Sequence, residues 1–205
     1  MKLRYAVIGT GALGGFYGGM LARAGAEVHF LLNGDYEHVK KNGLKVDSVH
    51  GNFTLRTVSV CHDAAQMPPC DVVLVCLKTT NNGLLKEILS PLVTENSVVV
   101  LVQNGLGMEK ELATWFPGLP VAGGLAFICS SKIGKGHIAH FDYGKITFGA
   151  YQHEKPEVMQ QICRDFEQAG VPAMLADDLY LARWKKLVWN IPYNGLTVAL
   201  NTSTD

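Results

Sequence analysis

Apolar residues along the first part of the chain fall into short runs, separated by turns or by segments of helical periodicity. This alternation is typical of an α/β protein. Four runs predict buried strands: Tyr5–Ile8, Glu27–Leu32, Asp71–Leu77 and Ser97–Val102. Helices are predicted after the first run, to about Gly25, and after the third, in GLLKEILSPLV. The nearly all-apolar runs suit a parallel sheet that is covered on both faces and has right-handed crossovers.

Two other segments alternate between apolar and polar residues, as strands with one buried face do. Residues 44–60 have Gly51-Asn52 at their centre, and residues 133–149 alternate around glycines. We expect a β-hairpin in each. Three further elements are predicted: a strand at Pro120–Ile128, an amphipathic helix at Pro156–Ala169 and a short strand in VPAML.

The predicted fold class is α/β, with residues 1–177 forming a Rossmann-type, doubly wound and mostly parallel sheet that would bind a dinucleotide. After Asp178 the pattern changes to one long helix that includes Leu181–Leu200. Pro192 lies inside this helix and should kink it or end its first part. Because one helix cannot form a domain, we interpret residues 178–205 as the first helix of a truncated all-α C-terminal domain for substrate binding and dimerisation.

Composition excludes several classes of function. The 205 residues are 48% hydrophobic and 18% charged, and their formal net charge is zero, which argues against a nucleic-acid or membrane surface as partner. Five cysteines without a CxxC pair indicate a reduced, cytoplasmic protein.

The basic and then apolar start resembles a secretory signal, but its glycine spacing is better explained by a strand and a turn.

The glycine spacing that follows the first strand is the clearest chemical signal. Gly9, Thr10, Gly11, Ala12, Leu13 and Gly14 form G-x-G-x-x-G between a strand and a helix, which is the context of a dinucleotide site. The first glycine permits a tight turn, the second lets the backbone approach a pyrophosphate, and the third allows the helix to pack closely on the strand. The alternative is a glycine-rich turn without a ligand.

The end of the second strand should distinguish NAD from NADP, because an acid there binds ribose hydroxyls and an arginine accommodates the 2′-phosphate. Asn33 occupies this position, and Asp35 follows two residues later. Lys40 and Lys41 lie on the next helix, where a solvated face is the simpler interpretation. These residues leave both NADPH and NADH open as cofactors.

Polar residues also follow the next two predicted strands. Lys78 ends DVVLVCLK and Asn104 follows SVVVLVQ. Ligands of open α/β sheets bind at the carboxyl ends of strands, so these residues and the glycine motif would share one edge. Each by itself is equally compatible with an ordinary cap or loop residue.

Three polar residues recur every four positions in the last helix. Lys186, Asn190 and Asn194 therefore share one helical face in an otherwise apolar segment. A partly desolvated lysine can protonate the oxygen of a carbonyl as a hydride adds to its carbon, and amides can orient a keto acid. The alternative is a solvated outer face. The same helix would expose Trp189, Ile191 and Leu196, which predicts a homodimer or disorder of this end.

His137 and His140 form an HxxH pattern in a predicted strand. Their separation of three residues places them on opposite faces of that strand. No third ligand is evident, so we expect no metal site.

Four motifs together resemble the ketopantoate reductase family: GTGALGG, LVCLKT, LVQNGLG and W-x-K-L-x-x-N-x-x-x-N. The resemblance covers essentially the whole chain. It implies NADPH-dependent reduction of 2-dehydropantoate to pantoate, in pantothenate and coenzyme A synthesis.

The resemblance also implies roles for individual residues. Lys186 would be the proton donor, Asn190 and Asn194 would bind substrate, Asn104 would contact substrate and nicotinamide, and Lys78 would lie beside the cofactor. Members often carry an arginine at the position of Asn33, and their helical C-terminal domain supplies further site residues. Two alternatives are a related 2-keto or 3-hydroxy acid dehydrogenase and a non-catalytic NAD(P)-binding module.

Overall fold

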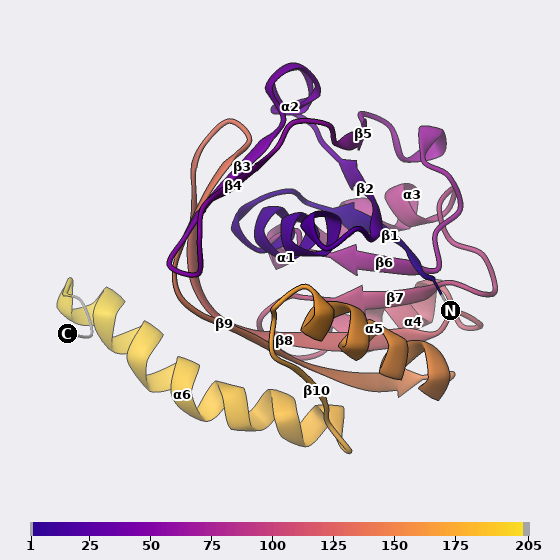
Figure 1. Ribbon diagram of the computed structural model, residues 1–205. Helices are drawn as coiled ribbons and strands as arrows, with labels where there is room; N and C mark the ends of the chain where they lie inside the picture. The colour runs from indigo at the N-terminus through magenta and orange to yellow at the C-terminus, as the bar shows by residue number, and fades with distance from the viewer. Residues whose placement is uncertain (1, 203–205) are drawn as a thin grey trace.

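The four apolar runs form the centre of a ten-stranded sheet in the computed structural model, which describes residues 2–202 (Figure 1). They are β1 (Arg4–Ile8), β2 (Glu27–Leu31), β6 (Val72–Val75) and β7 (Val98–Leu101). These strands are parallel, and the parallel part of the sheet has the order β5-β2-β1-β6-β7-β8. This is the strand order of a Rossmann fold, so the predicted fold class is confirmed.

Helices cover both faces of this sheet because alternate residues of each central strand point to opposite sides. Tyr5 and Val7 belong to the core under α1 (Ala12–Arg23) and α5 (Pro156–Gln168). Ala6 and Ile8 belong to the core under α3 (Leu85–Leu89) and α4 (Met108–Trp115). Besides the last helix, described below, the remaining helices among the described residues are α2 (Tyr36–Asn42) and two short 3₁₀ helices, Ala64–Gln66 and Thr79–Leu84.

The first predicted hairpin is shorter than expected. β3 (Leu44–Ser48) and β4 (Phe53–Leu55) pair antiparallel, but β5 (Ser59–Cys61) leaves the hairpin and pairs parallel with β2. The amide of Leu32 donates to the Cys61 carbonyl at 2.9 Å, which extends this pairing. The extension of the hairpin to residue 60 was therefore wrong, because β5 instead covers what would be an open edge of β2.

The second predicted hairpin is longer than expected. The strand predicted at Pro120–Ile128 and the hairpin predicted at 133–149 are one unit, in which β8 (Val121–Gly134) pairs antiparallel with β9 (His137–Gln152). Register shifts interrupt this pairing, and such bulges bend strands. β8 can thus pair with β7 at one end of the hairpin, while β9 pairs with β3 near the tip and with β10 (Ala173–Leu175) elsewhere.

The last helix, α6 (Leu179–Leu200), begins where Asp178 accepts a hydrogen bond from the Leu181 amide at 2.9 Å. Pro192 lies inside this helix and does not end it, so of the two expected effects the ending of the first part was wrong. The carbonyl that loses its donor belongs to Val188, which is 73% exposed, and water can satisfy it.

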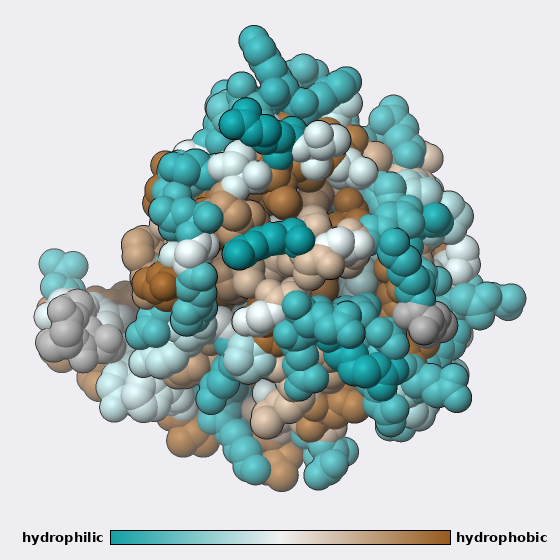
Figure 2. All heavy atoms as spheres, viewed as in Figure 1, coloured by the Kyte–Doolittle hydropathy of each residue, from teal (hydrophilic) through white to brown (hydrophobic). Residues whose placement is uncertain are grey.

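The second half of α6 extends beyond the sheet (Figure 1). Hydrophobic side chains lie along the lower edge of the molecule, where Figure 1 draws this helix (Figure 2). Trp189, Ile191 and Leu196 are more than half exposed, at 57%, 62% and 53%, so the predicted exposure is confirmed. No helix within residues 2–202 is long and apolar enough to cross a bilayer.

Candidate active site

One edge of the sheet carries the expected site residues that follow its central strands. The glycine motif follows β1, Lys78 follows β6, and Asn104 follows β7. These three strands are parallel neighbours, so their carboxyl ends lie side by side. Gln103 joins the last two loops, because its amide nitrogen donates to the Leu77 carbonyl and to the side chain of Asn82, both at 2.8 Å.

The surroundings of the three motif glycines explain why each position lacks a side chain. Gly9 has a φ of +92°, and a Cβ there would lie 2.8 Å from the backbone nitrogen of Leu77. A Cβ on Gly14 would lie 2.3 Å from the Gly9 carbonyl oxygen. A Cβ on Gly11 would meet no atom within 4 Å. Gly11 therefore leaves space open, whereas the other two glycines permit close packing.

That open space belongs to a cavity of about 850 Å³, which we call the loop cavity. Of the expected cofactor residues, Gly9, Thr10, Gly11 and Lys78 line it, whereas Ala12, Leu13 and Gly14 form the first turn of α1 and do not. Cys76 also lines the cavity, and burial raises the pKa of its thiol to about 12, so it stays protonated.

The β2 end of the loop cavity contains an ion pair. One carboxylate oxygen of Asp35 accepts from Lys132 Nζ at 2.7 Å and from the backbone amide of Gly136 at 2.9 Å. Burial by itself raises the pKa of this carboxyl, but these two donors outweigh it and lower the pKa below its usual value. Asp35 is therefore ionised and tied to the tip of the β8–β9 hairpin.

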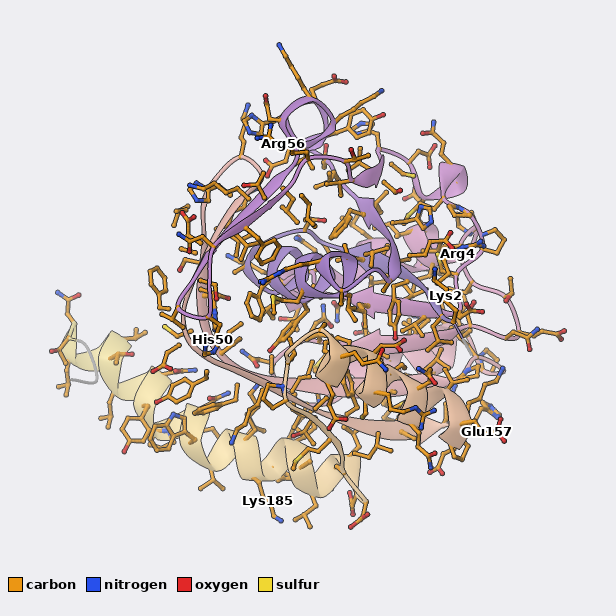
Figure 3. All side chains as sticks on the ribbon, viewed as in Figure 1. Lys2, Arg4, His50, Arg56, Glu157 and Lys185 are labelled. Carbon is orange, nitrogen blue, oxygen red and sulfur yellow. The ribbon has the colours of Figure 1, made fainter. Side chains whose placement is uncertain are left out.

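A second cavity, of about 570 Å³, lies between α6 and strands β8, β9 and β10, and we call it the helix cavity. Lys186 and Asn190 line it together. Lys186 Nζ donates to the Ala126 carbonyl at 2.6 Å. Burial, with a smaller contribution from Arg183, lowers the pKa of Lys186 to about 8. The neighbouring Lys185 is exposed on the outer side of α6 (Figure 3).

A buried ion pair that the sequence interpretation missed anchors α6 to the sheet. Arg183 is 3% exposed and forms a salt bridge with Glu109, the second residue of α4. The same guanidinium donates to the carbonyls of Gln103 and Leu101, the latter at 3.1 Å. Arg183 thus connects the helix that carries Lys186 to the loop that carries Asn104. Glu109 lies 74 residues before Arg183, so no local spacing in the sequence could have indicated this pair.

The structure brings only part of the predicted stripe together. Lys186 and Asn190 share the helix cavity, but Asn194 is exposed farther along α6 and lines neither cavity. Asn104 is also exposed and lines neither. Among the described residues, the glycine motif and Lys186 therefore line different cavities.

The two histidines of the HxxH pattern have separate partners. His137 contacts the Asp47 carboxylate at 2.6 Å, and His140 contacts the Ser48 hydroxyl at 2.8 Å. Within residues 2–202 no group of three or more His, Cys, Asp or Glu side chains is placed to hold a metal ion.

Comparison with known proteins places this chain in a family. The family profile described as "Ketopantoate reductase PanE/ApbA" matches residues 5–153. A 2-dehydropantoate 2-reductase of a Nostoc species is 54% identical over 98% of this chain and 65% of its own length. The chain therefore spans about 65% of the length of this relative.

Solved structures give the same assignment. The 2-dehydropantoate 2-reductase of Geobacter metallireducens is 44% identical, with a TM-score of 0.92 over 97% of this chain and 66% of that one. The enzyme of the same name from Methylococcus capsulatus is 35% identical, with a TM-score of 0.91 over 98% of this chain and 65% of that one. Because the family profile matches well over half of the residues, this chain belongs to the ketopantoate reductase PanE/ApbA family.

Proposed function

We propose that this chain carries the cofactor site and the catalytic lysine of an enzyme that reduces 2-dehydropantoate to pantoate with NADPH, in pantothenate and coenzyme A synthesis. The observation that carries the proposal is Lys186, a half-buried lysine with a lowered pKa, which shares a cavity with Asn190 beside the carboxyl edge of a Rossmann sheet. The names of the relatives from Nostoc and Geobacter metallireducens support the same substrate.

The loop cavity fits a nicotinamide dinucleotide. Gly11 leaves room for a pyrophosphate at the N-terminus of α1, whose free amides and dipole favour anions. Thr10 and Lys78 line the same cavity and would contact the cofactor. When bound, NADPH supplies the hydride for the ketone carbon.

Lys186 would protonate the oxygen of the ketone as it gains negative charge. Its ammonium has three N–H groups, and the Ala126 carbonyl accepts one of them, which orients the side chain and leaves two for substrate. Asn190, one turn away, would hold the keto acid through its side-chain amide. We assign Asn194 and Asn104 to substrate binding as well, with Asn104 also close to the nicotinamide.

We also propose the domain division at residues 177 and 178. Residues 1–177 would be the dinucleotide-binding domain, and residues 178–205 the start of a helical substrate domain. The exposed side chains of α6 would then be covered by other helices or by a second copy in a homodimer. Reduced cysteines support a cytoplasmic location, because all five are free thiols.

The direct test is to titrate the 205-residue chain with NADPH and NADH, and then to assay it with 2-dehydropantoate and a panel of other 2-keto acids. If the reading frame encodes a longer form, the same assay should be made on that form. Activity in the longer form alone would show that the 205-residue chain lacks a required domain and that the assigned reaction is correct. Turnover of 2-dehydropantoate above the other keto acids supports the proposal. Nucleotide binding without turnover by either form would favour a non-catalytic module.

Gly14→Ala should affect the stability of the fold, whereas Gly11→Ala should affect the binding of NADPH. Gly14→Ala should lower the free energy of unfolding by about 1–3 kcal/mol or more, because its methyl group would collide with the Gly9 carbonyl. Gly11→Ala should keep the fold within about 1 kcal/mol but weaken NADPH binding, because its methyl group would enter the loop cavity. Urea unfolding and NADPH titration of both variants check this, and a stable Gly14→Ala chain would contradict it.

The rate of reduction should depend on the protonation of Lys186. A proton donor must be protonated, so kcat/KM for reduction should be constant below the pKa of about 8 and fall about tenfold per pH unit above it. Oxidation of pantoate runs through the same lysine as a base, so its rate should rise over the same range. Profiles in both directions provide the measurement, and a reduction rate that increases above pH 8 would assign the proton to another group.

A further inference from the structure

We propose that Lys132 binds the 2′-phosphate of NADPH and is the residue that makes this chain prefer NADPH over NADH. The proposal rests on the function proposed above, in which the loop cavity holds the cofactor. Lys132 takes the place of the arginine that the sequence lacks after β2, although it lies on a distant strand, β8.

The fold places Lys132 at the ribose end of the loop cavity. In a Rossmann site the residues after β2 contact the adenosine ribose, and here these are Asn33, Gly34 and Asp35. Lys132 lines the same cavity as these residues. The β8–β9 hairpin curves beside β3 and β4 toward α2, so that its tip lies next to the loop that follows β2 (Figure 1).

Asp35 is the residue that would otherwise favour NADH, since an acid after β2 binds the two ribose hydroxyls. One oxygen of its carboxylate instead accepts from both Lys132 and the amide of Gly136, and the residue is only 7% exposed. A 2′-phosphate would meet the ammonium that neutralises this carboxylate. Asp35 therefore orients the lysine.

Lys132 keeps the capacity to bind a phosphate. Its ammonium has three N–H groups, and Asp35 accepts one of them at 2.7 Å. The Lys132 side chain is 39% exposed, compared with 9% for the side chain of Asp35, and Lys132 lines the cavity. Two N–H groups and a positive charge are the features that a phosphate requires.

The other charged groups that line the cavity do not replace Lys132. Lys78 is the other lining lysine, but it follows β6, on the opposite side of β1 from β2. His62 Nδ1 faces the Leu32 carbonyl at 3.1 Å and is occupied there. Asp63 accepts from the amide of Ala65, and Glu87 lies on α3; both are acids and repel a phosphate. Lys132 is therefore the cation at the β2 end among the described residues.

Lys132→Gln tests this role, because glutamine can still donate to Asp35 but carries no charge. We expect the Kd for NADPH to rise about tenfold to hundredfold and the Kd for NADH to stay within about twofold. Lys135→Gln is the matched control: Lys135 lies in the turn of the same hairpin, is exposed and does not line the loop cavity, so it should change neither Kd. Lys132→Arg should retain the preference for NADPH.

Titrations of the 205-residue chain, followed by tryptophan or nucleotide fluorescence, give these constants without any assay of turnover. Thermal unfolding of each variant shows that the fold is kept. If Lys132→Gln leaves the ratio of the two Kd values unchanged, whether affinity is kept or is lost equally for both nucleotides, the inference is overturned and the proposed function stays in place. Failure of the unmodified chain to bind either nucleotide would overturn the proposed function itself.

Discussion

Lys186→Ala is expected to lower kcat for 2-dehydropantoate reduction by about 10²–10⁴-fold in a form of the protein that turns over. The substitution removes the proposed proton donor, and with it the positive charge that would stabilise the new alkoxide. The fold should survive, because Lys186 is only partly buried and its one hydrogen bond goes to the Ala126 carbonyl. Steady-state kinetics and NADPH titration together provide the measurement, and cofactor affinity should change little, since Lys186 does not line the loop cavity.

The adjacent lysine provides the control for this prediction. Lys185→Ala removes the same charge one residue earlier, from an exposed side chain at the rim of the same cavity. Its kcat should stay within about twofold of the unmodified value, since it has no direct role in the proton transfer. Equal activity of the two variants would show that Lys186 is not the proton donor.

Arg183→Leu is expected to lower the free energy of unfolding by about 3–5 kcal/mol, because it leaves the buried carboxylate of Glu109 without its partner. The same change removes the donors to the carbonyls of Leu101 and Gln103. α6 would lose its anchor on the end of β7, so the start of the helix should become less ordered. Urea unfolding measures the first effect, and hydrogen exchange over residues 179–186 measures the second.

The double variant Arg183→Leu/Glu109→Leu separates a lost ion pair from a lost packing contact. Because it leaves no buried charge, it should be more stable than Arg183→Leu alone. If the single variant unfolds at the same urea concentration as the unmodified chain, the ion pair does not hold α6 in place.

Local patterns in the sequence were sufficient where the physical requirement is itself local. The apolar runs correctly predicted β1, β2, β6 and β7, because a strand buried on both faces needs apolar residues at every position. The glycine motif predicted three steric requirements, and a Cβ at Gly9 or Gly14 would indeed collide with the backbone. The face shared by Lys186 and Asn190 follows from helical periodicity alone.

The two hairpins show where local patterns became insufficient. Alternation correctly indicated strands in residues 44–60 and 133–149, but it cannot specify which strand pairs with which. β5 pairs with β2 because the edge of β2 is free, and β8 continues to Gly134 because bulges let it bend. Likewise, Pro192 was expected to kink or end α6, but the exposure of Val188 decides that the helix can continue.

The sequence by itself determined the fold class and the family, and it supplied the residues of the proposed site, because each depends on local patterns and motif spacing. Tertiary structure decided which partners those residues contact and how far they are buried. Lys186 reaches the carbonyl of Ala126, 60 residues away, and Arg183 pairs with Glu109, 74 residues away. Lys132 meets Asp35 only because the β8–β9 hairpin bends back to the loop after β2. Such contacts depend on strand pairing and burial, so periodicity and motif spacing carry no information about them.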